Sequence, residues 1–519
     1  MARSKNQPII QSVDGDSTKK RDIPISPSLL ENKQMIQKMA GDGSDVFGRE
    51  FVVNVSNKQD LSIFITGIDG LVDERTIREQ VVEPLLANPL DINTDVINSI
   101  KERLYVKDVN EEKNLYSCLL KMNKGSTIIL IDSLQTAIVI GAISSAERSI
   151  EEPPTGIVVS GSREGFVENL ATNISLLRKR ISHPSLKFVT YTLGEFSQTD
   201  VAIVYVQGVV DPKTVERMDQ LIRKIDVDDI SSSGQIEQYL SENTYSIFST
   251  TGNTERPDQL AAMLMEGRSG VIINGDPVAL YYPSLFIEKL QSVEDYSSKP
   301  FYSSFIRILR FFAFLLSILL PAFYVGGVNF HKEMIPSSFL LILKESREGV
   351  PFPLVLETFM LLIIFEIVRE AGVRMPRAIG QAVSIVGALI IGEVSVQAGL
   401  ISAQTIIVVA TASITTFIVT PVAEVASLLR LLYIIPSALF GLYGLMVCLL
   451  ITVTHMVNLK SMGVPYLSPI MPLYIRDWKD ALVRFPYKLL KFRPKSIPNV
   501  RPVRYKKVPQ HKGEEDDSL

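Results

Sequence analysis

The residues that could do chemistry in this chain of 519 residues are few, and the most unusual is a glutamate in an apolar segment. Glu393 lies near the end of residues 378–394, which carry no other ionisable group. An ionisable side chain inside such a segment usually faces water, a partner charge or an ion pathway. The same segment is rich in Gly, Ala and Ser, which permit close helix packing or a narrow lumen. Two interpretations stay open: Glu393 faces a pore, or it lies at the outer headgroup level.

Catalytic signatures are missing from the sequence. It contains no phosphate-binding loop, no zinc-protease motif, no CxxC pair and no nucleophile elbow. Cys118 and Cys448 are far apart and the four histidines lie singly, so neither a disulfide framework nor a zinc site is predicted. The Gly-rich turn at 160–166 could hold an anion with Arg163, although a capped turn is the simpler interpretation. We therefore expect no catalytic residues, no cofactor and no metal, and a protein that is not an enzyme.

Composition limits the classes of protein that remain. The chain has 53 Lys and Arg against 56 Asp and Glu, a formal charge of −3, and 46% hydrophobic residues. This balance argues against a nucleic-acid-binding protein and against a disordered chain. The first 22 residues lack the apolar stretch of a secretory signal, so the part that follows is expected in the cytosol.

The elements that must position these residues begin with a soluble α/β region. Residues 1–48 are polar and predict a mobile tail, and apolar β-rich runs then alternate with helical patterns up to residue 299. Residues 61–80 resemble 202–221, and residues 126–140 resemble 269–283, at offsets of 138 and 143 positions. Two similar offsets in one order indicate a duplicated unit, with subdomains at 49–152 and 153–299; chance likeness of short hairpins is the alternative.

Two helices of the second subdomain can be placed from their residue patterns. One helical face is predicted by apolar residues that recur at spacings of three and four, namely Phe166, Leu170, Ile174, Leu177 and Ile181. A second helix is predicted to begin at Pro257 and Asp258 and to end at Gly267.

The remainder of the chain predicts a polytopic α-helical membrane domain at 300–458. Five apolar runs lie at 308–328, 353–368, 378–394, 400–420 and 428–456, several of them near the ~20 residues that cross a hydrocarbon core. Basic residues precede the first run, lie between the second and third, and fill the tail at 459–519. The positive-inside rule places both chain ends in the cytosol, and the basic tail is expected to bind anionic lipid headgroups rather than nucleic acid.

The number of runs conflicts with that orientation. If both chain ends lie on the same side of the membrane, the chain must cross it an even number of times, whereas the number of apolar runs, five, is odd. We therefore expect one broken or re-entrant segment, with the break between Gly392 and Gly399 as its place.

Three passages resemble the A subunits of GerA-type spore germination receptors. They are residues 152–181, residues 254–283 with Val-Glu-Asp-Tyr at 293–296, and residues 345–402, and the resemblance extends over about residues 50–490. It departs from the family pattern at Phe248-Ser249-Thr250, where Phe-Pro-Gln is usual, and at Ser269. The residues that match the family signature are Arg163, Glu164, Gly165, Arg256, Pro257, Asp258, Gly267, Arg268, Gly275, Pro277, Arg369, Glu370 and Pro376.

The resemblance implies a multi-pass subunit of a nutrient receptor in the inner membrane of the spore. It implies a homo-oligomer, with a pentamer as the expected form, that acts as a germinant-gated cation channel. A transporter-like B subunit, expected to bind the small-molecule germinant, and a lipoprotein C subunit are the implied partners. The third apolar run is the implied pore lining, through Ser384, Gly387, Ile391, Glu393, Val394 and Gln397. Ile391 or Val394 would suit a hydrophobic gate. A secondary transporter and a non-conducting assembly or signalling scaffold of the same complex are the alternatives.

Overall fold

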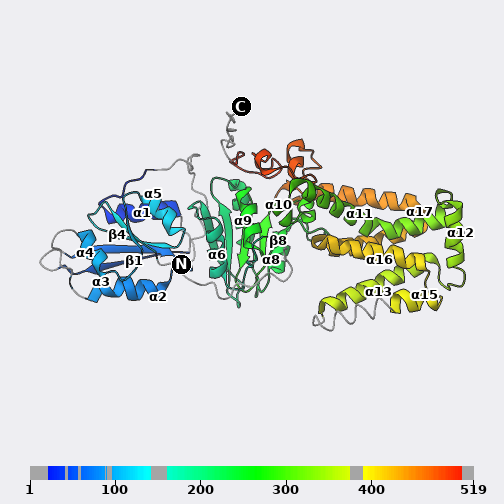
Figure 1. Cartoon of the computed structure of the whole chain (residues 1–519), viewed down its shortest axis with the longest axis horizontal. Coiled ribbons are helices and arrows are strands. Elements are labelled where there is room, and N and C mark those ends of the chain that lie inside the picture. Colours follow the sequence, from blue (N-terminus) through cyan, green and yellow to red (C-terminus); the bar gives the residue numbers. More distant parts are fainter. Residues whose placement is uncertain are drawn as a thin grey trace, which may run out of the picture.

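The computed structural model places two α/β subdomains and a helical region in a row along the long axis (Figure 1). It describes residues 22–40, 45–55, 60–87, 89, 96–141, 161–374 and 390–504.

The first subdomain is a five-stranded antiparallel sheet with helices on both faces. Its strands are β1 (Val46–Val53), β2 (Leu61–Ile68), β3 (Val109–Glu112), β4 (Ser126–Ile131) and β5 (Ala137–Gly141), in the spatial order β1-β2-β4-β5-β3. Ile128 and Leu130 face α1 (Leu29–Ala40) and α5 (Leu115–Met122), because successive side chains of a strand alternate between faces. Ile129 and Ile131 face the opposite layer. That layer is formed by α2 (Glu74–Ile77), the π-helix Arg78–Val82, α3 (Glu83–Ala87) and α4 (Val96–Arg103).

Helix α1 lies in the part of the chain for which a mobile tail is predicted. Leu29, Ile36 and Ala40 are buried against the sheet, and Asp132 Oδ1 accepts a hydrogen bond of 3.2 Å from Leu29 N. Three widely spaced apolar residues are enough to dock this helix, although the segment is polar on average.

The second subdomain repeats the topology of the first. Its strands are β6 (Leu186–Leu193), β7 (Thr199–Val206), β8 (Gly252–Thr254), β9 (Ser269–Ile273) and β10 (Ala279–Tyr282). Their order, β6-β7-β9-β10-β8, is the order of the first sheet. Asp73 and Asp211, 138 positions apart, cap the helices that follow β2 and β7 by accepting from the backbone N–H two residues on. The shared strand order and capping site are what a duplicated unit predicts.

The two faces of the second sheet are covered by α6 (Leu170–Arg180) with α9 (Pro257–Met265), and by α7 (Pro212–Ile222) with α8 (Ser233–Leu240). The predicted apolar face of α6 is buried in the first of these layers. Helix α9 begins at Pro257 as predicted, with Pro in the first turn, where its missing N–H costs nothing.

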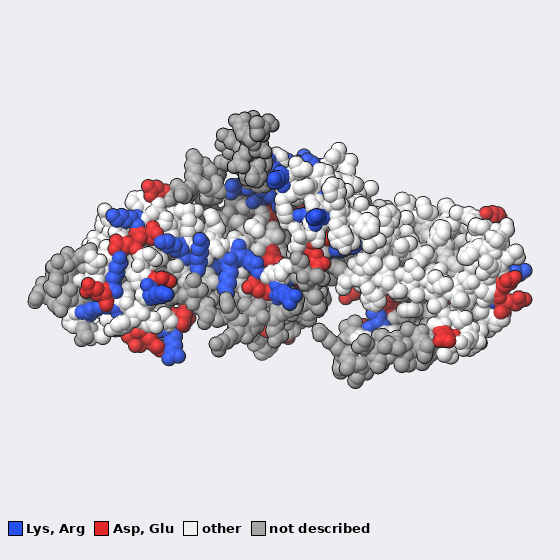
Figure 2. Space-filling view, viewed as in Figure 1, with Lys and Arg blue, Asp and Glu red and all other residues white. Residues whose placement is uncertain are grey.

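The helical region contains two helices that are long and apolar enough to cross a membrane among the residues that the structure describes. They are α11 (Pro300–Phe330) and residues 420–458, which include α17 (Ala423–Asn458); the apolar helix α16 (Ala403–Ile418) is shorter. The other α- and π-helices are α10 (Glu294–Ser297), α12 (Ser337–Ser346), α13 (Leu354–Arg374), the π-helix η4 (Ile390–Val394) and α15 (Ser395–Gln397). Figure 2 shows that charged side chains are sparse on this face of the helical region.

Helix α17 is two helices that fold back on each other at Gly441. Gly441 has φ 62° and ψ −147°, a conformation that is nearly restricted to glycine. Tyr433 Oη donates to Thr452 Oγ1 at 2.8 Å, although 19 residues of straight helix would separate them by about 28 Å. Residues 423–440 and 442–458 therefore run antiparallel.

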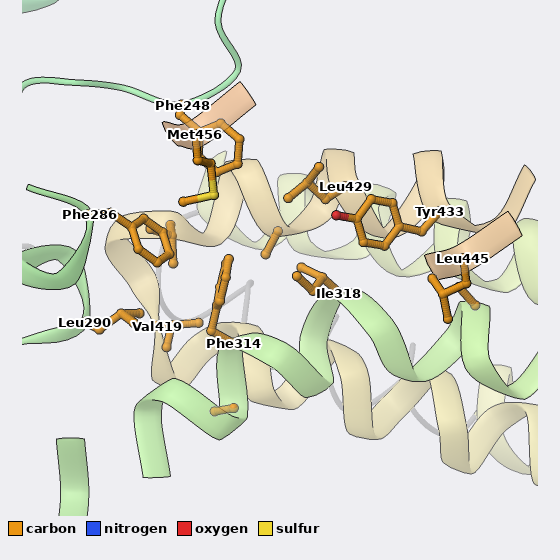
Figure 3. Close-up of a cluster of buried hydrophobic side chains, with 14 of the residues drawn as sticks. Phe248, Phe286, Leu290, Phe314, Ile318, Val419, Leu429, Tyr433, Leu445 and Met456 are labelled. Carbon is orange, nitrogen blue, oxygen red and sulfur yellow. The ribbon is translucent and has the colours of Figure 1, made fainter. Parts of the chain in front are cut away.

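The helices extend between a near end, beside the second subdomain, and a far end. At the near end Val419 packs in one cluster with Phe286 and Leu290 (Figure 3). At the far end a Cβ on Gly441 would lie 2.8 Å from Phe330 Cβ, at the end of α11. The run at 428–456, treated as one in the sequence, thus starts and finishes at the near end.

The segment 459–504, predicted as part of a basic tail, is folded against the rest of the chain. It contains β11 (Lys460–Ser461), β12 (Val464–Pro465) and the 3-10 helices Ile475–Asp480 and Tyr487–Leu489. Val500 N donates to Val209 O at 2.9 Å, and Arg493 Nε donates to Met265 O at 2.6 Å. These two hydrogen bonds join it to the second subdomain.

Candidate functional site

A network of buried charges joins the second subdomain, the C-terminal segment and the start of α11. Asp295, in the Val-Glu-Asp-Tyr passage, accepts hydrogen bonds of 2.9 Å from Arg307 Nε and from Arg310 Nη1. Arg307 Nη1 also donates to Asp480 Oδ1 at 3.0 Å and to Asp480 O at 2.9 Å. The side chains of Arg307 and Asp295 are 1% and 3% exposed. These contacts hold the start of α11 to the segment that follows the second subdomain and to the C-terminal segment.

Titration of this network is governed by burial. Burial raises the pKa of the Asp480 carboxyl above its usual value, while Arg307 favours the charged form. Burial, with Asp480 close by, also raises the pKa of Tyr296, whose hydroxyl donates to Asp480 Oδ2 at 3.1 Å. The tyrosine therefore stays a neutral donor across the physiological range.

The signature residues Gly267 and Arg268 follow α9: Gly267 lies against the C-terminal segment, and Arg268 pairs with Glu288. Gly267 has φ +107°, and a Cβ there would lie 2.8 Å from Asn499 Cβ, so glycine is required for the close approach. Arg268, 2% exposed, makes two hydrogen bonds to the carboxylate of Glu288, one of them 2.9 Å long. Such a two-bond pair also fixes the orientation of both side chains.

Other signature residues organise the turns around α6 and α9. Arg256 Nη2 donates to Ser162 O at 2.9 Å and to Asp258 Oδ2 at 2.7 Å, which ties the start of α9 to the turn at 161–166. In that turn Glu164 pairs with Arg180, Gly165 is buried and Arg163 is exposed. Gly275 adopts φ +94° beside Pro277 in the β9–β10 turn.

An anion site at the start of α6 is not supported by this geometry. Asn169 Oδ1 accepts from Thr172 N at 3.0 Å, and Asn274 Oδ1 accepts from Leu170 N at 3.1 Å. Side-chain oxygens thus occupy these two N–H groups, which agrees with the capped turn.

A second set of buried charges lies inside the helical region, between α13 and α17. Arg430, 2% exposed, donates from Nη2 to Glu366 Oε1 at 2.7 Å. Arg369 Nη2 lies 2.7 Å from Glu366 Oε2, and its Nη1 donates to Ser427 Oγ at 2.9 Å. Because Arg430 and Arg369 both pair with the single carboxylate of Glu366, this cluster has a net positive charge. It lies toward the near end of the helices.

A buried carboxylate at the far end connects the start of α13 with the start of α16. Glu357 Oε1 accepts from Ser402 N at 2.7 Å and from Ser402 Oγ at 2.6 Å, and its side chain is 0% exposed. Arg347 Nε lies 3.8 Å from Glu357 Oε2. Residues 374 and 402, which flank the third apolar run, therefore lie at opposite ends of the helices.

The predicted pore residues are only partly described. Ser384 and Gly387 lie outside the described residues, as do the side chain of Ile391, whose backbone belongs to η4, and the signature residue Pro376. Glu393, Val394 and Gln397 are exposed, Val394 to 50%. Gln397 Nε2 donates to Glu393 Oε1 at 3.2 Å, one helical turn away.

In the described part of the chain, Glu393 and Gln397 are hydrogen-bonded to each other, and neither is bonded to the buried charges of α13 and α17. Of the signature residues, Arg369 belongs to the α13–α17 cluster, and Glu370 pairs with Arg374 on the exposed side of α13 at 2.6 Å. Sequence reasoning did not identify Asp295, Glu357 or Asp480. Two sequence features could have pointed to them: Asp295 belongs to the Val-Glu-Asp-Tyr passage, and Glu357 is a carboxylate in a largely apolar run.

Comparison with known proteins gives the family. The family model described as Bacillus/Clostridium GerA spore germination protein matches residues 34–496. The chain is 41% identical over 483 residues to "Spore germination protein KA" of Bacillus subtilis (strain 168), with 92% of this chain and 88% of the relative covered. It is 34% identical over 477 residues to "Uncharacterized membrane protein YfkQ" of the same organism, with 91% and 92% covered.

One solved structure is similar to part of this chain. It is the crystal structure of the N-terminal domain of the A subunit of the Bacillus megaterium spore germinant receptor GerK3, with 27% identity and a TM-score of 0.41. The match covers 51% of this chain and 99% of that one. On the strength of the family model and the relatives, the chain belongs to the GerA family of spore germination proteins, the A subunits of germinant receptors.

Proposed function

We propose that this A subunit forms a germinant-gated cation channel together with further copies of itself. The single observation that carries the proposal is the exposure of the pore candidates. Glu393, Val394 and Gln397 lie on the surface of one chain rather than in its interior. A carboxylate and an amide on an otherwise apolar helical surface are costly in lipid. Further copies arranged around these residues would give them an aqueous lumen.

The direction of the helices supports a membrane domain with six crossings. Helix α11 runs from the near to the far end, α13 returns, and α16 runs back to the near end. The hairpin in α17 goes out and returns, which adds two. One further passage between residues 374 and 402 makes the number even. Both chain ends are then on the cytosolic side, in agreement with the basic residues that precede α11.

The buried charges suggest how gating is coupled to the soluble region. Helix α13 precedes the pore candidates along the chain and is held to α17 by Glu366 and Arg430. Helix α11 is held to the soluble region by Asp295 and Asp480. We assign germinant binding to a transporter-like B subunit, with a lipoprotein C subunit as a further partner, and place the complex in the inner membrane of the spore. A pentamer is the proposed oligomer.

The test is ion flux from liposomes that contain the purified receptor complex, together with the mass of that complex. Val394→Ala should widen an apolar constriction and release K⁺ without germinant, because a wider apolar gate is wetted more easily. Ile407→Ala, at an exposed apolar position of α16, is the matched control and should stay closed. A monomeric mass, or equal flux in both variants, would contradict the proposal. Flux that persists when an unrelated anchor replaces the helices would favour the scaffold.

A further inference from the structure

A cavity of about 50 Å³ opens in the C-terminal segment beside the start of α11. About 10–15 Å³ is enough for one water molecule, so this cavity has room for a group of phosphate size. Its basic lining residues are Arg476, Lys479, Arg493 and Arg504. The basic tail that the sequence predicts is thus partly arranged as a shaped site.

The acidic residues of the lining are already engaged elsewhere. Asp477 accepts from Lys495 N at 2.9 Å and from Ser496 N at 2.7 Å. Asp480 accepts from Arg307 and Tyr296. The four basic side chains therefore outnumber the two carboxylates, and neither carboxylate is held by the basic lining in the contacts described.

One of the basic groups, Arg504, is only partly satisfied. Arg504 Nη2 pairs with Glu266 Oε1 at 2.5 Å, while its buried Nε has no hydrogen-bond partner within the described part of the chain. Burial, followed by the charges of Arg504 and Arg501, lowers the pKa of Arg493 to about 10. A positive site of this kind is stabilised by an anion.

The position of the cavity and its apolar rim indicate where that anion comes from. Leu489 and Phe492 line it and are 56% and 44% exposed. Arg484 N, in the same segment, donates a hydrogen bond of 3.0 Å to Ser304 Oγ in the first turns of α11. Tyr302 of those turns is 61% exposed between the exposed Phe301 and Phe305, and tyrosine is typical of the aromatic belt at a membrane surface.

We propose that this cavity binds the phosphate of an anionic phospholipid from the cytosolic leaflet, with Leu489 and Phe492 against the upper part of the acyl chains. The basic side chains would bind the phosphate group. The apolar rim would favour a lipid over inorganic phosphate, because inorganic phosphate carries the same kind of charge but has no acyl chains. The inference rests on the membrane location proposed above. Because Asp480 belongs to both the cavity and the Arg307 network, a bound lipid would stabilise the junction between the soluble region and α11.

The test uses Trp478, the single tryptophan of the chain, which lies between Asp477 and Lys479 of the lining and is 37% exposed. The full-length protein is reconstituted in phosphatidylcholine vesicles that contain either brominated phosphatidylglycerol or brominated phosphatidylcholine at equal bromine content. Bromine on the acyl chains quenches tryptophan fluorescence at short range. We expect stronger quenching by phosphatidylglycerol, with saturation at a low mole fraction.

Variants and competition separate the possible outcomes. Arg476→Gln with Lys479→Gln should weaken phosphatidylglycerol binding about 25-fold, from about fivefold for each basic residue near an anionic surface. Lys213→Gln with Lys224→Gln, on the second subdomain, changes the charge equally and should have no effect.

Equal quenching by both lipids would overturn the proposal. Competition by inorganic phosphate at millimolar concentration would overturn the lipid as ligand in favour of a soluble phosphate. Lipid binding without ion flux would contradict only the channel, and flux without preferential quenching would contradict only the lipid site.

Discussion

The ion pair between Glu366 and Arg430 gives the sharpest prediction for the helical region. Glu366→Gln removes the carboxylate and leaves Arg430 buried, with Ser413 and Ser427 oxygens each 3.4 Å away as its remaining polar contacts in the described structure. Removing one partner of a buried ion pair costs about 3–5 kcal/mol. The Glu366 side chain is 20% exposed, so we expect the lower part of that range, about 3 kcal/mol.

The assay is thermal unfolding of the full-length protein in detergent, followed by K⁺ efflux from liposomes. For a unit of about 200 residues, 3 kcal/mol corresponds to a fall of roughly 6–12 °C in the unfolding midpoint. Because the pair holds α13 to α17, basal efflux should rise in the same variant. Glu370→Gln is the matched control on the same helix, since its pair with Arg374 is exposed and contributes little.

A double variant distinguishes an unpaired charge from a general loss of packing. Glu366→Gln combined with Arg430→Met removes the buried cation as well and should restore most of the lost midpoint. The reasoning is refuted if Glu366→Gln unfolds at the wild-type midpoint. It is also refuted if the double variant is as unstable as the single one.

Three further predictions concern the junction, the subdomain interface and the hairpin. Asp295→Asn should lower the unfolding midpoint by several degrees, because it weakens the pairing of buried Arg307, whereas Asp226→Asn on the exposed surface should not. His183 Nε2 lies 3.3 Å from Tyr116 Oη of the first subdomain, and burial and Lys187 lower the pKa of His183. The stability that neutral His183 contributes is therefore complete above about pH 6.5, the usual histidine pKa, and is lost as the pH falls toward the lower pKa of the folded state. The wild-type midpoint should therefore fall more than that of His183→Gln between pH 7.5 and 5.5, and parallel curves would contradict this assignment. Gly441→Ala should destabilise the protein by about 1–3 kcal/mol from backbone strain alone. The control Gly372→Ala, where a Cβ meets open space within helix α13, should be neutral or slightly stabilising. Equal unfolding midpoints for the two variants would argue against the hairpin.

Much of the α/β region could be predicted from the sequence because its signals are local. The spacing of Phe166 to Ile181 predicted α6, and the offsets of 138 and 143 residues predicted two units, which have the same strand order. Helix α1 could not be predicted in the same way, because its docking depends on a sheet formed much later in the chain. The fold of residues 459–504 depends likewise on distant partners such as Val209 and Met265.

The helical region was harder to predict, because hydropathy depends on composition and does not show where the chain reverses its direction. The largely apolar run from Leu428 to Met456 has the same hydropathy whether it crosses once or folds back at Gly441. If the run at 428–456 is counted as two helices, the five apolar runs become six segments, which is an even number. In the same way the sequence identified Glu393 from its apolar surroundings, while the pairing of Arg430 with Glu366, 64 positions away, required the packing of α13 on α17.

The most direct test of the central claim asks whether Val394 and Gln397 line an ion pathway. Cysteine is introduced at each position in a Cys118→Ala, Cys448→Ser background, and the receptor complex is reconstituted in liposomes. A positively charged methanethiosulfonate reagent should reduce germinant-stimulated K⁺ flux at both positions. It should leave Ile407→Cys unaffected, because Ile407, although also exposed on the single chain, lies on α16. Flux that is unchanged by modification at Val394 and Gln397, with labelling confirmed by mass, would contradict a pore lined by these residues.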